Sequence, residues 1–306
     1  MALLLDELLG EPPSRLHPVV AAGAWLTRAA RHVPEGPPAR AVAAGGAAWG
    51  LGALAAGLAG AALARALRPL PWPAAAVVEG VALWPLLSSR MLRHEVTAVE
   101  DALGRSLADG RTQVSRLVSR DTRTLDVEAV RGAALGSLSE NLSDSVVAPL
   151  LAHAAGGLPG AAVYRYANTA DAMWGYRTPR WLHAGRVAAR ADDLTNLVPA
   201  RVSALLLLAV ARAPRHLARL RAQARLTPSP NGGWPMGAMA LVLGVRMAKP
   251  GVYALHPDGR AATAADTRRA VRLVAAVTVA AWPVAAVVSL VRQALVRRAL
   301  MHGAVA

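Results

Sequence analysis

The stretch A-V-A-A-G-G-A-A-W-G-L-G-A-L-A-A-G-L-A-G-A-A-L at 41–63 decides the fold class of this chain. It contains no charged residue, and a helix of about 20 apolar residues crosses the roughly 30 Å hydrocarbon core of a bilayer. Alanine and glycine supply most of the stretch, as in membrane helices that pack closely against one another. The stretch therefore predicts a membrane-spanning helix.

The composition of the whole chain agrees with a membrane protein. Its 306 residues are 54% hydrophobic and include no Phe, more than an ordinary soluble domain needs. The formal net charge of +15 is carried by arginine, because Lys249 is the only lysine. These arginines are scattered through the connecting segments, which favours contacts with anionic lipid head groups over a nucleic-acid-binding face. The absence of cysteine excludes disulfides and cysteine-ligated metals, and acids near the N-terminus argue against a cleavable signal peptide.

Four further apolar runs predict additional membrane helices, at 73–87, 146–163, 197–211 and 271–291. The first should form a hairpin with 41–63 through the proline-rich turn between them. The run at 146–163 is interrupted by Pro and Gly, which predicts a kinked or re-entrant helix. The last run should be kinked at Pro283.

Two polar segments, 88–137 and 212–270, separate the apolar runs. Apolar residues in the first recur at roughly helical spacing, which predicts two or three amphipathic helices in water or at the interface. The second contains an arginine-rich part, a small-residue helix at 235–247 and a polar loop at 249–266. With no internal repeat, we predict one all-α, multi-pass membrane domain over 1–306, with interfacial helices and kinked or re-entrant segments.

Reactive side chains are concentrated between Ser139 and Arg201, beside apolar runs. They include five carboxylates and three amides: Glu140, Asp144, Asp171, Asp192, Asp193, Asn141, Asn168 and Asn196. Ionisable residues next to membrane helices are costly and usually mark a substrate or ion path. Acids and amides suit Mg²⁺, whereas arginines such as Arg190 and Arg201 suit phosphate oxygens. The loop from Ser229 through Asn231 to Gly233 would offer free backbone N–H groups to an anion.

Several of these residues also have purely structural interpretations. Ser137-x-x-Glu140 fits a capping box at the start of a helix. His17 precedes a proline turn near an acid, and the Arg120-Asp121 pair fits a capping arrangement in a loop. Arg201 could extend to the lipid head groups.

Known catalytic motifs for other reactions are missing. The chain has no P-loop, no H-E-x-x-H, no G-x-S-x-G and no dinucleotide-binding fingerprint. The residues by themselves therefore predict a membrane-embedded, Mg²⁺-dependent site for a phosphorylated or otherwise anionic substrate.

Long motifs in one order resemble the CobD/CbiB family. They are L-L-L-D-E-L-L-G-E-P at 3–12, H-P-V at 17–19, S-R-D-T at 119–122, S-E-N-L-S-D-S-V-V-A-P-L at 139–150, G-G-L-P-G-A-A-V-Y-R-Y-A-N-T-A-D-A-M-W-G-Y at 156–176, G-R-V-A-A-R-A-D-D-L-T-N-L-V-P-A-R at 185–201 and S-P-N-G-G-W-P-M-G-A-M-A at 229–240. The resemblance implies a multi-pass inner-membrane adenosylcobinamide-phosphate synthase. Such an enzyme uses ATP and Mg²⁺ to join aminopropanol or its O-phosphate to a carboxylate of adenosylcobyric acid as an amide.

The matched motifs also imply roles for individual residues. Asp192 and Asp193 would hold Mg²⁺ against nucleotide phosphates, and Glu140 or Asp144 would accept the proton of the incoming ammonium, with Asp171 as a third catalytic candidate. The candidate substrate-binding residues are His17, Arg120, Asp121, Asn141, Asn168, Arg190, Asn196, Arg201, Ser229 and Asn231. The expected partners are these small substrates and the lipid bilayer, without nucleic acid; the sequence leaves the oligomeric state open.

The sequence departs from the family pattern at a few positions. Glu11 stands for the usual Asp, Ala172 for Ser and Thr227 for His, and Ala248-Lys249-Pro250 replaces Gly-Gly-Pro. The last two differences bear on which amino alcohol is accepted.

Two other functions fit the sequence less well. An intramembrane prenyltransferase would need two Asp-rich repeats, and a transporter or corrinoid-handling subunit would be expected to show paired inverted segments.

Overall fold

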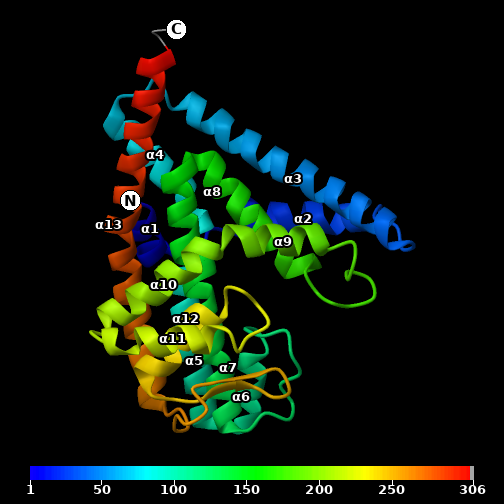
Figure 1. The fold of residues 1–306 in the computed structure, drawn as a ribbon, viewed down its shortest axis with the longest axis vertical. Helices are drawn as coiled ribbons and strands as arrows, with labels where there is room; N and C mark the ends of the chain where they lie inside the picture. The colour runs from blue at the N-terminus through cyan, green and yellow to red at the C-terminus, as the bar shows by residue number, and fades with distance from the viewer. Residues whose placement is uncertain (304–306) are drawn as a thin grey trace. The chain divides into compact units, whose positions relative to one another are not determined.

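The computed structural model describes residues 1–303, which are almost entirely helical, as predicted (Figure 1). The helices form two compact units, each built from separate parts of the chain. Unit 1 contains Met1–Leu87, Ala148–Thr195 and the chain from Trp282 onward, and unit 2 contains Ser88–Val147 and Asn196–Ala281.

Unit 1 contains six helices that lie wholly within it and two short 3₁₀ turns. The helices are α1 (Ala2–Leu9), α2 (Pro18–Ala30), α3 (Pro38–Ala66), α4 (Trp72–Leu83), α8 (Ala148–Trp174) and α9 (Arg186–Thr195), and the turns are Ser14–Leu16 and Trp84–Leu86.

The long helix α3 packs against α8 and α9 through glycine (Figure 1). A Cβ atom at Gly45 would lie 2.0 Å from the carbonyl oxygen of Ala184, and one at Gly60 would lie 2.8 Å from that of Leu158. Because both contacts are with backbone, Gly60 is required for α3 to approach α8 so closely, and Gly45 is required for α3 to approach the turn before α9. The close packing of small residues expected for 41–63 is confirmed.

The predicted hairpin between the first two apolar helices is wrong. Helix α4 packs mainly against α1 and α8. The small-residue face of α3 is already covered by α8 and α9, so it is not available to α4.

Helix α8 is kinked, as its Gly and Pro residues predicted. Gly157 has non-helical angles of φ 63° and ψ −159°, and Pro159 follows inside the same helix. A positive φ is accessible to glycine at little cost. The chain enters α8 through a π-helical turn, Ser143–Val147, which continues directly from α7.

Unit 2 contains the amphipathic helices predicted for 88–137. Its elements are α5 (Ser89–Arg105), α6 (Leu107–Val114), α7 (Val127–Leu142), the π turn, α10 (Leu197–Val210), a 3₁₀ turn (Pro214–His216), α11 (Leu217–Ala224), α12 (Gly233–Leu243), β1 (Met247–Lys249), β2 (Tyr253–Leu255) and the first part of α13 (Ala264–Gly303). Helix α12 is apolar on all sides because it packs against α7, α10 and α11. Fully buried leucines of α7 and α10 complete this core.

The segment predicted as a polar loop at 249–266 is partly a β-hairpin. Strands β1 and β2 pair antiparallel, with Met247 opposite Leu255 and Lys249 opposite Tyr253. Met247 and Leu255 are buried against the helices, which fixes the register of the hairpin.

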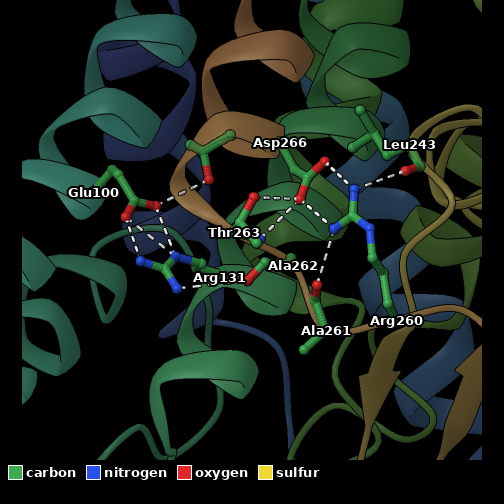
Figure 2. Close-up of polar contacts among 9 residues, drawn as sticks. Glu100, Arg131, Leu243, Arg260, Ala261, Ala262, Thr263 and Asp266 are labelled. Carbon is green, nitrogen blue, oxygen red and sulfur yellow. Dashed lines mark hydrogen bonds and ion pairs between the residues drawn. The ribbon is translucent and has the colours of Figure 1, made fainter.

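Two ion-pair clusters connect the start of α13 to the rest of unit 2 (Figure 2). The guanidinium of Arg131 on α7 donates to both carboxylate oxygens of Glu100 on α5, at 2.6–3.1 Å. Glu100 also accepts from the Thr267 hydroxyl of α13 at 3.0 Å. In the second cluster, Arg260 donates to both oxygens of Asp266 at 2.6 and 2.8 Å.

The membrane prediction is confirmed by helix length and composition. Among residues 1–303, four helical stretches are long and apolar enough to cross a bilayer: Pro38–Ala66, Trp72–Arg105, Val127–Trp174 and Ala264–Leu295. Helices α9 and α10 together would make a fifth, as a bent pair. The runs predicted from the sequence therefore account for these spans.

Candidate functional site

Unit 2 contains a polar cavity of about 180 Å³ beside the C-terminal half of α7. One wall comes from α7, a second from the loop that follows α6, and a third from the β-hairpin and α12. Its lining residues are Leu117, Val118, Ser119, Arg120, Ala133, Gly136, Ser137, Glu140, Asn141, Met236, Lys249 and Tyr253. The structure thus brings together three candidates predicted from the sequence, Arg120, Glu140 and Asn141.

Hydrogen bonds fix the walls of this cavity to one another. Asn141 donates from Nδ2 to the carbonyl and hydroxyl oxygens of Ser137, at 3.0 and 3.3 Å. Ser137 in turn donates to the carbonyl oxygen of Leu117 at 3.2 Å, and Arg120 donates to that of Ala248 at 3.5 Å. The loop is therefore attached both to α7 and to the hairpin.

The capping-box interpretation of Ser137 and Glu140 is wrong. Helix α7 begins at Val127, and the carboxylate of its N-cap Asp126 accepts from the N–H of Ala129 at 2.8 Å. Ser137 and Glu140 lie two turns and more inside the helix, so no free N–H groups are present there to be capped. Their position leaves Glu140 exposed to the cavity.

The charges of the cavity are mixed, with two cations, Arg120 and Lys249, and one carboxylate, Glu140. Burial, together with the negative charge of Glu140, raises the pKa of the Tyr253 phenol. Tyr253 therefore remains a neutral hydroxyl in the physiological range and can donate a hydrogen bond. Cations on the loop and on the hairpin, and a carboxylate on α7, suit a ligand that carries both signs of charge.

Asp144 lies just beyond these residues, in the π turn. The sequence predicted that Glu140, Asn141 and Asp144 share one side of a regular helix. The wider turn at 143–147 changes the direction of the side chains after Leu142, and Asp144 is not among the residues that line the cavity. Single π turns inside helices occur frequently at functional sites.

A second polar group in unit 2 joins α10 to the loop before α12. Arg201 donates to the carbonyl oxygen of Leu197 at 2.6 Å and to Oδ1 of Asn231 at 3.3 Å, and its guanidinium lies 4.8 Å from the ring centre of Trp234. The hydroxyl of Ser229 accepts from the backbone N–H groups of Asn231 and Gly232, both at 3.1 Å. The expectation that this loop offers free N–H groups is therefore wrong for these two.

In unit 1, the acids and amides of α8 and α9 face one another. Asn168 donates from Nδ2 to Oδ1 of Asp192 at 3.2 Å and accepts from Arg165 at 3.3 Å. Asp193 forms an ion pair with Arg190 at 3.8 Å. The structure thus pairs Asn168 with Asp192 and Arg190 with Asp193.

Asp192 is a single carboxylate, and its Oδ1 accepts from the amide Nδ2 of Asn168 at 3.2 Å. Neighbouring helix positions point in different directions, so Asp192 meets α8 whereas Asp193 meets Arg190. Among the side chains that the structure describes, no group of three or more His, Asp or Glu could hold a metal. Mg²⁺ usually keeps several waters and binds through one or two carboxylates plus substrate phosphates, which such a donor set permits.

Asp171 lies one turn after Asn168 on α8. A Cβ atom at Gly175 would lie 1.9 Å from its Oδ1 and 2.7 Å from its backbone oxygen. Glycine at 175 is therefore needed where the end of α8 folds over this carboxylate.

Three other candidates have clear structural surroundings. His17 caps α2 by accepting from the N–H of Val19 at 3.2 Å, and its other ring nitrogen is paired with Glu11. Asp121 pairs with Arg123 rather than with Arg120, at 2.7–3.1 Å, and Arg123 lowers the pKa of this exposed carboxyl to about 2. Asn196, immediately before α10, is buried.

Unit 1 also contains an apolar cavity of about 470 Å³ between α2, α3 and α8. Its lining is mostly alanine, glycine and leucine, with Arg165 and Thr169 as polar members. Such a lining suits apolar groups rather than phosphate.

Sequence reasoning missed three residues of these sites. Lys249 and Tyr253 fall in a segment that was predicted to be a loop, and they reach the cavity because that segment is a hairpin. Arg165 lies inside a quoted motif, but its contact with Asn168 depends on the α8–α9 packing. Two signals pointed to Lys249: it is the single lysine of an arginine-rich chain, and it stands where the sequence departs from the Gly-Gly-Pro of the family pattern.

The fold and sites define a class: a multi-pass helical membrane protein with polar clusters of acids, amides and arginines beside its apolar helices. The family model described as CobD/Cbib protein matches residues 1–274. The chain is 41% identical to the cobalamin biosynthesis protein CobD of Rhizobium meliloti over 83% of its own length and 81% of that protein's. It is 43% identical to that of Stutzerimonas stutzeri, over 82% of each chain, and 40% identical to that of Chromobacterium violaceum, over 90% of each chain. No solved structure matches. The chain belongs to the CobD/CbiB family of cobalamin biosynthesis proteins.

Proposed function

We propose that this protein is an adenosylcobinamide-phosphate synthase of the inner membrane. It joins the propionate carboxylate of adenosylcobyric acid to the amine of aminopropanol or its O-phosphate. The observation that carries this proposal is the family match over residues 1–274, which includes every acidic motif of the two polar clusters.

The reaction requires activation of a poor electrophile. The substrate carboxylate attacks the terminal phosphorus of ATP, ADP leaves, and an acyl phosphate forms. The free amine then attacks the acyl carbon, so that the C–N bond forms while the bond to the phosphate oxygen breaks and inorganic phosphate leaves. The ammonium must lose a proton before this attack, and Glu140 or Asp144 accepts it.

Positioning and neutralisation of charge supply most of the catalysis in phosphoryl transfer. Asp192 would contribute a carboxylate to Mg²⁺, which would neutralise charge on the nucleotide phosphates, whereas Asp193 forms an ion pair with Arg190. Asn168 orients Asp192 through the 3.2 Å hydrogen bond, and the exposed Arg190 on the same helix as Asp192 would contact phosphate oxygens.

Purified full-length protein in detergent tests the proposal directly. Incubation with adenosylcobyric acid, aminopropanol phosphate, ATP and Mg²⁺ should yield the amide, detected by mass, and omission of ATP should abolish it. A corrinoid-handling subunit would bind the corrinoid without forming this product, and that result would refute the proposal.

Asp192→Asn provides the residue-level test. Amide formation should be lost while thermal unfolding in detergent stays unchanged, because Asn keeps the volume and one acceptor. Asp109→Asn is the matched control, since Asp109 is half exposed and pairs only with neighbouring Arg105. Full activity in Asp192→Asn would remove the metal-binding role.

A further inference from the structure

The polar cavity of unit 2 has the size and charge to select one substrate. Pockets for drug-sized ligands occupy about 300–1,000 Å³, whereas this cavity measures about 180 Å³. The space that it encloses therefore fits a short molecule rather than a whole nucleotide or corrinoid. Its lining of serine, asparagine, tyrosine and charged groups favours a short polar molecule.

The β-hairpin places a cation at this cavity. Lys249 lies directly opposite Tyr253 in the antiparallel pair, and residues in such a pair project from the same face of the hairpin. Both side chains line the cavity. Arg120, held by its hydrogen bond to Ala248 at 3.5 Å, adds a second cation beside the same strand.

The opposite charge is supplied from α7. Glu140 lines the cavity and is exposed, so a ligand can reach it. With two cations and one carboxylate the cavity carries a formal charge of +1. A phosphate ester carries about −1.5 to −2 near pH 7, and an ammonium on the same molecule brings the ligand close to −1, which complements the cavity.

We propose that this cavity binds the amino alcohol as its phosphate ester, with Arg120 and Lys249 on the phosphate and Glu140 on the ammonium. The assignment rests on the proposed ligation and makes Lys249, with Arg120, select the phosphorylated over the free amino alcohol. It also places the ammonium at Glu140, one of the two groups proposed to accept its proton.

Binding to the full-length protein in detergent, measured by calorimetry with aminopropanol phosphate and with aminopropanol, tests the assignment. Lys249→Gln should weaken binding of the phosphate ester by about 10- to 100-fold, because one charge-assisted hydrogen bond is lost. Binding of aminopropanol should be unchanged. Lys249→Arg should bind the phosphate ester with an affinity within a few-fold of wild type. Glu140→Gln should bind both ligands more weakly. Arg105→Gln, an exposed control, should bind both ligands as tightly as wild type.

The amide-forming assay separates this proposal from the proposed function. Amide formation with an unchanged KM for the phosphate ester in Lys249→Gln would overturn the cavity assignment and leave the ligation intact. If binding of the phosphate ester depends on Lys249 but the protein forms no amide, the cavity assignment stands and the proposed ligation is refuted. Phosphatidylethanolamine has a related head group, an ethanolamine phosphate diester, and its addition should not compete; competition would identify a lipid site and overturn the assignment of a soluble substrate.

Discussion

Arg131→Met should destabilise unit 2 far more than the loss of an ordinary surface ion pair. The Arg131 guanidinium donates three hydrogen bonds to Glu100, at 2.6, 3.0 and 3.1 Å, and a fourth to the Ala262 carbonyl at 3.5 Å. The substitution leaves the Glu100 carboxylate with the Thr267 hydroxyl as its remaining contact in this cluster (Figure 2). A charge is then left in a largely desolvated place.

The size of the effect follows from burial. Removing one partner of a fully buried ion pair costs about 3–5 kcal/mol. The side chains of Arg131 and Glu100 are 21% and 13% exposed, so we expect a cost of about 2–3 kcal/mol after allowing for solvent. For a chain of this size that corresponds to a fall in Tm of about 3–5 °C.

A second ion pair, which also has one member on α7, provides the control. Arg246 bonds Glu128, near the start of α7, at 2.7 and 3.1 Å, but these side chains are 47% and 33% exposed. Arg246→Met should therefore cost less than about 1 kcal/mol. The double variant Arg131→Met/Glu100→Leu should recover most of the stability, because it removes the unpaired charge.

Thermal unfolding of the four proteins in the same detergent measures these differences. Equal shifts for Arg131→Met and Arg246→Met would refute the argument from burial. A double variant as unstable as Arg131→Met would show that the loss comes from packing rather than from the orphaned carboxylate.

Two further outcomes follow from packing and from titration. Gly52→Ala should lower Tm, because the added Cβ would lie 2.1 Å from the Tyr166 hydroxyl oxygen and overpacking costs about 1–3 kcal/mol of stability. Gly50→Ala is the control and should leave Tm unchanged, because a Cβ there has nothing within 4 Å. Similar Tm values for the two variants would contradict this. Burial, and then Arg219, lower the pKa of His256, so its contribution to stability is present above its unfolded pKa of about 6.5 and is lost as pH falls below that value. Between pH 7 and pH 5 the Tm of the wild type should fall more than the Tm of His256→Asn. Asparagine is chosen because it tolerates the positive φ of 44° at this position. Equal falls in Tm would exclude His256 as the titrating group.

Composition and hydropathy were sufficient to predict the helical membrane fold, because a long uncharged run has few alternatives to a spanning helix. The kink in α8 was also predictable, because Gly157 and Pro159 distort the helix locally, whatever packs against it. The partner of α4 was not predictable, because helix packing depends on which small-residue faces meet. The β-hairpin was missed because its short strands carry a weak pattern, and its register depends on burial of Met247 and Leu255 against helices distant in sequence.

The candidate site shows the same division between local and long-range information. Motifs identified Arg120, Glu140 and Asn141 one at a time, but no spacing rule connects them to Lys249, more than 100 residues further along the chain. The cavity forms because Glu140 lies well inside α7, beyond the capped start of that helix, and because the hairpin places Lys249 at the same cavity. A lysine that looks like one more basic residue in the sequence thus becomes, in the fold, the cation opposite a carboxylate. Selection between a phosphorylated and a free amino alcohol would then depend on this side chain together with Arg120, which is why the effect of Lys249→Gln should differ between the two ligands.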